Sequence, residues 1–292
     1  METARVKLQG TYSLLAGFIL LLGVPIYQIA FLGPAGYQAP ANTAFSQGNY
    51  GPLLAWISTH GSAFVIYRFL ELIAFLLAIR LPLALRLALR GYGRTLTRWM
   101  VGTGIGGLGI FAAMIAVSTF SFVNAAAQYG GQAPASAAAN TILTNFNTVY
   151  FVEGVGQNTV GGALIAIFLV CASLLIARSG KFTGLLVYFG LLVAALMAAL
   201  ALLFTVSAPS AQSLPTPAIL SFAVWLIWLG ILLVQRARRL LAAPVSAAAS
   251  AASPDEAPVS ADDNAGQTDE RPEETASPQP LASQASEPEA PQ

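Results

Sequence analysis

Long apolar runs separated by short polar connections fill the chain up to about residue 243. Each run is long enough to cross about 30 Å of hydrocarbon as a helix that rises about 1.5 Å per residue. We therefore predict membrane-spanning helices near residues 11–32, 57–80, 99–122, 150–177, 182–207 and 217–235. The predicted fold is all-α, a bundle of six transmembrane helices that occupies residues 1–243 as one domain.

The composition supports a polytopic membrane protein. Of the 292 residues, 56% are hydrophobic and only 9% are charged, whereas soluble proteins have about 25% charged residues. A soluble domain of this composition would lack the polar surface that water requires.

The basic residues indicate how the spans are oriented. They lie before the first predicted span, after the second, after the fourth and after the sixth: Arg5, Lys7, Arg80, Arg86, Arg90, Arg94, Arg98, Arg178, Lys181, Arg236, Arg238 and Arg239. The alternate connections, 33–56, 123–149 and 208–216, carry no charge. Because basic loops stay in the cytoplasm, we predict a multi-pass protein of a bacterial inner membrane with both termini cytoplasmic.

The first span also fits a signal peptide, with Arg5 and Lys7 as its basic region and LLAGFILLLG as its apolar region. However, the apolar run continues through residues 26–32, and no clear small-x-small cleavage site closes it. We therefore interpret it as a span.

The C-terminal segment, residues 244–292, has a different composition. It holds ten of the thirteen acidic residues, one base (Arg271) and no aromatic residue. Such a segment cannot bury enough apolar surface to offset the entropy lost on ordering. We predict a disordered acidic cytoplasmic tail, which is either simply solvated or a docking segment for a basic protein partner.

The basic connection at residues 80–98 is amphipathic as a helix. Arg86 and Arg90 share one helical face, while Leu81, Leu85 and Leu89 gather on another. One interpretation is a helix on the cytoplasmic leaflet whose arginines contact anionic lipid headgroups, at about 1 kcal/mol each. The candidate headgroup contacts are Arg86, Arg90, Arg94 and Arg98. The alternative is ordinary topological anchoring, and the two are compatible.

Glycines cluster in the third span, as GTGIGGLG at residues 102–109. Gly102, Gly104 and Gly107 match G-x-G-x-x-G, but a dinucleotide site needs a strand before the motif, and here the motif lies within a membrane span. Gly102 and Gly106 also form G-x-x-x-G, which predicts close helix packing. Glycines around residues 154–162 of the fourth span indicate either an interrupted helix or another packing face.

The second span carries unexpected polar groups in YRFLELIAFLLAIR, residues 67–80. At 100° per residue, a single face of about 100° holds His60, Phe64, Tyr67, Arg68 and Glu71. Arg68 lies about 18 Å from Arg80 along a helix, which is too far for its side chain to reach the interface. Two charges cost about 5–7 kcal/mol and the surrounding apolar residues return about 5 kcal/mol, so the span inserts only marginally.

Glu153 of the fourth span is the remaining candidate polar residue. Aligning Arg178 with Arg80 as level ends places Glu153 about 20 Å from Arg68, near His60 instead. We therefore predict two polar layers, Arg68–Glu71 and His60–Glu153. Arg68–Glu71 is either a neutralised pair that fixes helix rotation or part of a binding or translocation site.

No catalytic constellation is apparent, so we predict no enzymatic activity. Intramembrane proteases use Ser/His, paired Glu/His or paired Asp residues, whereas this chain has one histidine and no aspartate before residue 255. One cysteine (Cys171) and one histidine cannot form a zinc site. We predict no metal, no cofactor and no nucleic-acid partner. The favoured hypothesis is a structural or regulatory membrane protein that binds lipid or partner proteins, and the alternative is a small-solute or proton-coupled transporter.

Three segments together carry a family resemblance: the basic connection after the second span, the turn LLIARSGKFTGLLVYFGLLVAAL, and the closing AVWLIWLGILLVQR. Over most of residues 11–236 the chain resembles a family of uncharacterised bacterial six-helix membrane proteins, a domain of unknown function. Phe182 and Thr183 stand where family members often have proline. The resemblance implies a six-helix bundle and supplies no catalytic residues.

Overall fold

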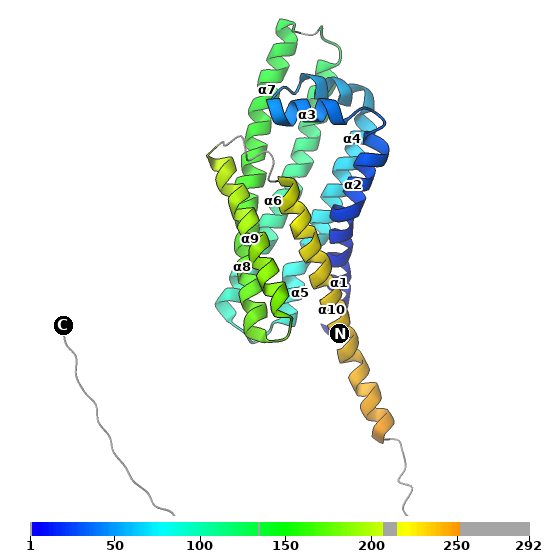
Figure 1. Cartoon of the computed structure of the whole chain (residues 1–292), viewed down its shortest axis with the longest axis vertical. Helices are drawn as coiled ribbons and strands as arrows, with labels where there is room; N and C mark the ends of the chain where they lie inside the picture. Colours follow the sequence, from blue (N-terminus) through cyan, green and yellow to red (C-terminus); the bar gives the residue numbers. More distant parts are fainter. Residues whose placement is uncertain (1, 134, 207–214, 252–292) are drawn as a thin grey trace, which may run out of the picture. The chain divides into compact units, whose positions relative to one another are not determined.

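The computed structural model describes residues 2–133, 135–206 and 215–251, and its regular structure there is helical throughout (Figure 1). The α-helices are α1 (Glu2–Phe18), α2 (Val24–Tyr27), α3 (Gln38–Gln47), α4 (Gly51–Ala78), α5 (Leu81–Ala88), α6 (Arg94–Tyr129), α7 (Ala137–Gly154), α8 (Gly162–Ser179), α9 (Gly184–Thr205) and α10 (Pro215–Ala251). Three π-helical segments, η1 (Ile19–Gly23), η2 (Gln28–Leu32) and η3 (Val155–Gly161), continue the α-helices that they adjoin. The all-α prediction is confirmed.

Six helical runs in the described residues are long and apolar enough to cross a membrane: Ala4–Leu32, Gly51–Ala88, Arg94–Tyr129, Ala137–Ser179, Gly184–Thr205 and Pro215–Arg238. Each coincides with one predicted span, so the protein is a multi-pass membrane protein with six candidate spans. The length of the apolar runs located these helices, because lipid-exposed and buried faces of a membrane helix are both apolar.

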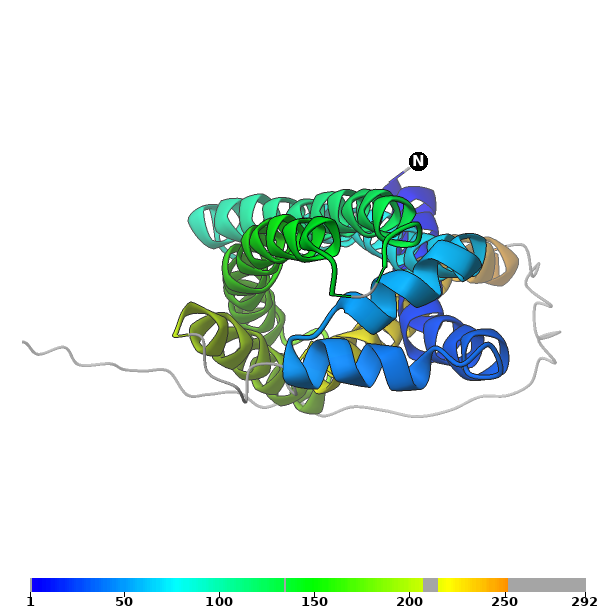
Figure 2. The same cartoon turned by 90° about the horizontal axis from the view of Figure 1, so that it is seen from above.

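Several helices extend further than predicted. The fourth run begins at Ala137 rather than near residue 150, because the Ser136 hydroxyl accepts a hydrogen bond from the Ala139 amide and so caps α7. Within the connection 33–56 lies α3, which runs across the ends of neighbouring helices (Figures 1 and 2). Gly48 ends α3 in a left-handed conformation, with φ of +69°.

The first part of the predicted tail, residues 244–251, continues the last helix. Helix α10 continues to Ala251, and this extension is rich in alanine, the residue with the highest helix propensity. The rest of the predicted tail, residues 252–292, lies outside the described residues.

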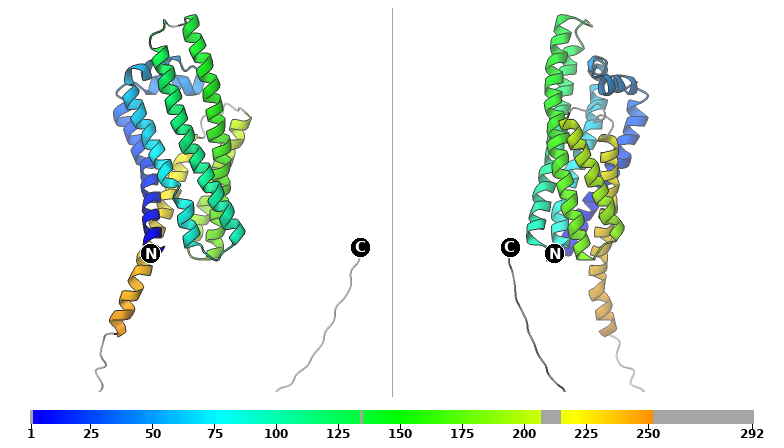
Figure 3. Two further views of the ribbon diagram at one scale, coloured as in Figure 1. Left: turned by 180° about the vertical axis from the view of Figure 1, so that it is seen from behind. Right: turned by 60° about the vertical axis from the view of Figure 1, so that its left-hand side comes forward.

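Helix α6 organises the bundle, because α4 packs antiparallel along one side of it and α7, η3 and α8 pack along another. Phe64 contacts Phe122 with tilted rings and Phe75 stacks on Phe111, at ring-centroid distances of 5.3 and 5.0 Å. Figure 3 shows α6 and α7 side by side over much of their length.

The bundle has two apolar cores at different levels. One includes Phe75, Phe111, Phe168 and Trp225 and extends to the end where α5 and the α8–α9 turn lie, which we call the basic end. The other includes Tyr37, Tyr50, Trp56, Phe122 and Phe146 and lies towards α3, which we call the aromatic end. Along α4, Arg68 and Glu71 lie between Phe64 of the second core and Phe75 of the first.

The first and last spans approach closely through small residues. A Cβ added at Gly230 would lie 2.9 Å from the Gly10 carbonyl oxygen, and one at Gly17 would lie 2.7 Å from the Ala223 carbonyl oxygen. The Ser13 hydroxyl donates a 3.0 Å hydrogen bond to the Leu226 carbonyl, which joins α1 to α10. Small residues serve this role in membranes because they let backbones touch.

In α6 the close-packing glycines differ from those predicted. No atom lies within 4 Å of a Cβ added at Gly102, and at Gly106 only Leu164 lies within ordinary contact distance. Gly104 and Gly107 instead face neighbouring helices: a Cβ there would lie 2.6 Å from Pro82 and 2.9 Å from Ile165. The prediction for Gly102 is wrong because the motif spacing does not specify which helical face meets a neighbour.

Replacing Gly107 with alanine should destabilise the bundle. The new Cβ would lie 2.9 Å from the backbone nitrogen of Ile165, and overpacking of this kind costs about 1–3 kcal/mol. Gly102→Ala is the matched control and should be neutral or stabilising by up to about 1 kcal/mol, since alanine has the higher helix propensity. Thermal unfolding in detergent measures both. Equal midpoints for the two variants would contradict the packing described here.

Candidate functional site

Arg68 and Glu71 form an ion pair one turn apart on α4. The second terminal nitrogen of Arg68 donates a 2.7 Å hydrogen bond to the Ser118 hydroxyl on α6. Both side chains of the pair are largely buried, with 16% and 17% of their surface exposed. The prediction that the two charges pair is confirmed, and the serine links the pair to a second helix.

Tyrosines cover the pair from the aromatic end. The Tyr67 hydroxyl donates a hydrogen bond to the Glu71 carboxylate, and its ring centroid lies 6.2 Å from that of Tyr37. Tyr37 precedes α3, outside the spans; burial raises the pKa of its phenol well above the usual range, and the negative charge of Glu71 adds to this. The segment before α3 therefore folds back to enclose the charged pair.

A second tyrosine pair lies beside the first. Tyr50, immediately before α4, donates a hydrogen bond to the Tyr150 hydroxyl on α7, and burial raises the pKa of Tyr50 far above its usual value. The ring centroids of Tyr50 and Tyr150 are 5.0 Å apart. Phenols at this position combine apolar contact with hydrogen bonding, which suits a polar layer inside an aromatic core.

Glu153 joins the same layer. The Ser121 hydroxyl donates a 2.6 Å hydrogen bond to its Oε1, and Ser121 is one helical turn from Ser118, the serine that binds Arg68. The positive charge of Arg68 also acts on Glu153 directly. The predicted separation of about 20 Å is therefore wrong, and one polar layer replaces the predicted two.

The predicted separation of Arg68 and Glu153 was wrong because it assumed that Arg80 and Arg178 lie at the same depth in the membrane. A Cβ added at Gly104 would lie 2.6 Å from Pro82 and 2.7 Å from Phe168, so those two residues are level. Arg68 precedes Pro82 by about 14 residues and Glu153 precedes Phe168 by about 15, so both lie about 21–23 Å along their helices. Helix α5 continues the second span beyond Arg80, which a charge-based boundary does not reveal.

His60 stands apart from this layer. The α4 backbone is non-helical at His60, with φ of −123°, and its ring stacks on Trp56 at a centroid distance of 4.7 Å. Its Nδ1 lies 2.8 Å from the Thr59 hydroxyl. In the described part of the chain, His60 forms no ion pair with Glu153, so the predicted His60–Glu153 pairing is not formed.

Two residues of the layer, Ser118 and Ser121, were not identified from the sequence. Both belong to an apolar span, and hydroxyls there often bond to their own helix backbone, as Thr119 does with the Ile115 carbonyl at 2.6 Å. Their spacing of three residues was the available signal, because it places two hydroxyls on one face.

The glycine-rich part of the fourth span combines both predicted possibilities. The helix widens into the π-helical segment η3, directly after Gly154. Gly156 and Gly161 of that segment also pack closely, with Met114 and Phe111 of α6 within 3.2 and 2.8 Å of an added Cβ. π-Helical turns are frequent at functional sites.

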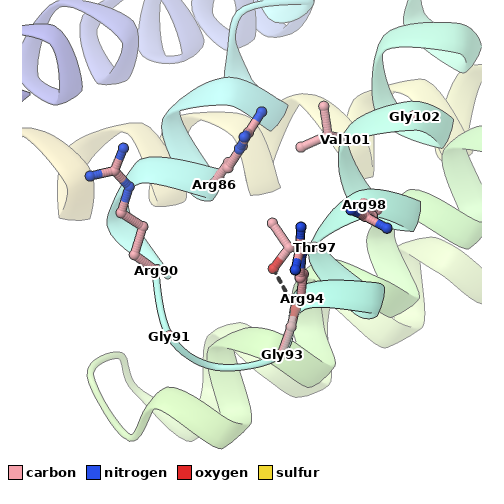
Figure 4. Close-up of a pocket in the computed structure, with 9 residues that line it drawn as sticks. All are labelled: Arg86, Arg90, Gly91, Gly93, Arg94, Thr97, Arg98, Val101 and Gly102. Atoms are coloured by element: carbon pink, nitrogen blue, oxygen red, sulfur yellow. Dashed lines mark hydrogen bonds between the residues drawn. The ribbon is translucent and has the colours of Figure 1, made fainter.

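The second candidate site is a pocket of about 740 Å³ at the basic end, between α5 and α6. Four arginines line it, Arg86, Arg90, Arg94 and Arg98, with the remaining lining from Gly91, Gly93, Thr97, Val101 and Gly102. Figure 4 shows arginine side chains from both sides of the α5–α6 connection around one hollow. The lining residues include no acidic side chain.

Glycines make the turn around this pocket. Gly91 and Gly93 have φ of +96° and +138°, values that other residues rarely adopt. The Thr97 hydroxyl donates a 2.7 Å hydrogen bond to the Gly93 carbonyl, which steadies the start of α6. Gly102 lines the pocket, and its missing side chain leaves space there.

Helix α5 does not turn its apolar face to a lipid surface, which was one of the two interpretations of the connection at residues 80–98. Leu81 and Leu85 are fully buried, and α5 contacts α1 and α6. Its apolar face therefore packs against protein, while Arg86 on its other side lines the pocket. An amphipathic pattern records that one face avoids water, and it does not distinguish lipid from protein as the cover.

Metal ligation is not evident. In the part of the chain that the structure describes, no three His, Cys, Asp or Glu side chains gather closely enough to hold a metal ion. Cys171 is a free, buried thiol.

The chain matches a known protein family. A family described as a domain of unknown function (DUF4386) matches residues 15–236. No curated protein and no solved structure matches the chain.

Replacing Arg68 alone with leucine should strongly reduce the yield of folded protein. The change leaves the Glu71 carboxylate buried without its cation, at a cost of about 3–5 kcal/mol. Adding Glu71→Leu should restore part of the yield, because no unpaired charge then remains. Size-exclusion chromatography of fluorescent fusions measures the folded fraction. A double variant no better than Arg68→Leu would show that the two charges do not act as a pair.

Proposed function

This chain belongs to the DUF4386 family, and we propose that it is a structural or regulatory membrane protein that binds the phosphate-bearing headgroups of anionic lipids. The arginine pocket between α5 and α6 is the observation that carries the proposal. The whole matched region, residues 15–236, includes this pocket.

The chemistry of the pocket suits a phosphodiester. Each guanidinium presents a planar set of donors that matches two phosphate oxygens. Arg94 and Arg98 also lie in the first turns of α6, where the helix dipole favours an anion. A volume of about 740 Å³ falls in the range of small-molecule sites, about 300–1,000 Å³.

Location and orientation form part of the same proposal. The basic residues gather at connections on one side of the predicted spans, and basic connections stay in the cytoplasm. We place both termini in the cytoplasm of a bacterial cell and the pocket at the inner leaflet of its cytoplasmic membrane. Anionic lipids at that surface attract arginines by about 1 kcal/mol each.

The Arg68–Glu71 pair serves a structural role in this proposal. It joins α4 to α6 through Ser118 and is covered by Tyr67 and Tyr37. An ion pair held between two helices in this way fixes the rotation of α4 and does not require a solute to neutralise it.

A proton-coupled or small-solute carrier is the second candidate function. One observation favours it: among the described residues, Glu153 Oε2 and Arg68 Nε are both buried without a hydrogen-bond partner, and ionisable groups within membranes are often functional. The absence of enzymatic activity and a protein partner for the acidic tail stay predictions from the sequence.

Replacing Arg94 and Arg98 together with glutamine should weaken anionic-lipid binding by about 30-fold, since two arginines contribute about 2 kcal/mol. Native mass spectrometry of the purified protein with phosphatidylglycerol measures the binding, and phosphatidylcholine should bind weakly to both proteins. Arg238→Gln is the matched control, because Arg238 is exposed on α10 outside the pocket. An equal loss in the control, or no loss in the double variant, would overturn the proposal.

A further inference from the structure

The polar layer between α4, α6 and α7 has an excess of acid. Arg68 contributes one positive charge, which Glu71 neutralises in the ion pair. Glu153 then adds a carboxyl group with no cation of its own, because within the described residues His60 stacks on Trp56 instead. If all three groups were ionised, one negative charge would remain uncompensated in the interior of the bundle.

Glu153 is also poorly solvated. Only 3% of its surface is exposed. Its Oε1 accepts a hydrogen bond from Ser121, and its Oε2 has no hydrogen-bond partner among the described residues. A buried carboxylate needs several donors or a close cation to remain charged, and one serine hydroxyl does not meet that need.

The groups around Glu153 come from each helix that packs there. Helix α4 supplies Arg68, whose own partner is Glu71, while α6 supplies Ser121 and α7 itself supplies Tyr150. On the side of α9 the neighbour is apolar: the Phe204 ring lies 3.8 Å from a Cβ added at Gly154, the residue after Glu153. Arg68 is thus the single cation that acts on Glu153 within the described residues, and it is already paired.

We propose that Glu153 is a proton-binding site, holding a proton as a neutral carboxylic acid within the membrane-spanning bundle at neutral pH. Binding a proton removes the excess charge without requiring further ligands. A hard metal cation would require about six oxygen ligands. Here a hydrogen bond brings together the Ser121 hydroxyl and the Glu153 carboxyl group, which supply fewer oxygens than such a cation needs. The π-helical segment η3 begins two residues later, at Val155, and gives this part of the span a backbone that can rearrange when the proton leaves.

Proton binding at Glu153 does not involve the arginine pocket, which lies at the basic end of the bundle. Loss of lipid binding in the pocket variants would therefore leave the proposal for Glu153 unaffected. Likewise, an ionised Glu153 would leave the proposal for lipid binding unaffected.

The test uses the full chain reconstituted in lipid vesicles at neutral pH. Dicyclohexylcarbodiimide enters membranes and reacts with protonated carboxyl groups: the carboxyl oxygen bonds to the carbodiimide carbon, and the acid proton moves to nitrogen. Peptide mass spectrometry should find the label on Glu153 and not on Glu71, which is ionised in its pair. Glu153→Gln should reduce labelling of the chain to background. Label on Glu71 with none on Glu153 would overturn the proposal.

Infrared spectroscopy provides a second measurement that does not depend on reagent access. The carbonyl band of a protonated carboxylic acid should be present in the wild type and lost in Glu153→Gln. Glu153→Gln should also fold as well as the wild type, because a neutral amide resembles the protonated acid, whereas Glu71→Gln should fold poorly. A wild type without this band, or one that keeps it in Glu153→Gln, would show that Glu153 is ionised.

Discussion

A guanidinium within an apolar bundle must find its partners inside that bundle, and α4, α6 and the segment before α3 are arranged around this requirement. Arg68 pairs with Glu71 on its own helix and donates to Ser118 on the next. Because the pair has a direction, it specifies the rotation of α4 against α6, which apolar packing alone would leave loosely determined. The aromatic core closes over it, and Tyr37 completes that cover.

The two ends of the bundle handle charge in opposite ways. Towards the aromatic end, few charges are present: Arg68 and Glu71 pair with each other, and the Ser118 and Tyr67 hydroxyls add hydrogen bonds at short range. At the basic end, arginines gather around an open pocket whose lining includes no acidic side chain. The like charges of Arg86, Arg94 and Arg98 repel one another, and an anion bound among them would reduce that repulsion, so the basic end favours an anionic ligand.

The sequence predicted the pairing of Arg68 with Glu71 but not the position of Glu153, because the two depend on different kinds of geometry. Pairing of Arg68 with Glu71 follows from a spacing of three residues within one helix, which is local geometry. The position of Glu153 depends on how two spans slide past one another, and that is set by contacts such as Gly104 against Pro82 and Phe168. Charges at the ends of the spans gave a false alignment, because α5 continues the second span beyond Arg80.

The sequence by itself determined the all-α class, the positions of six spans and the pairing of two charges, because hydrophobic length and helical periodicity are local properties. Only the tertiary structure decided which glycines pack, that α5 is covered by protein, that His60 turns to Trp56, and that Glu153 shares a layer with Arg68. Each of these depends on the relative rotation and sliding of helices. In a membrane every face of a helix is apolar enough to pack, so the pattern of residues alone does not choose among them.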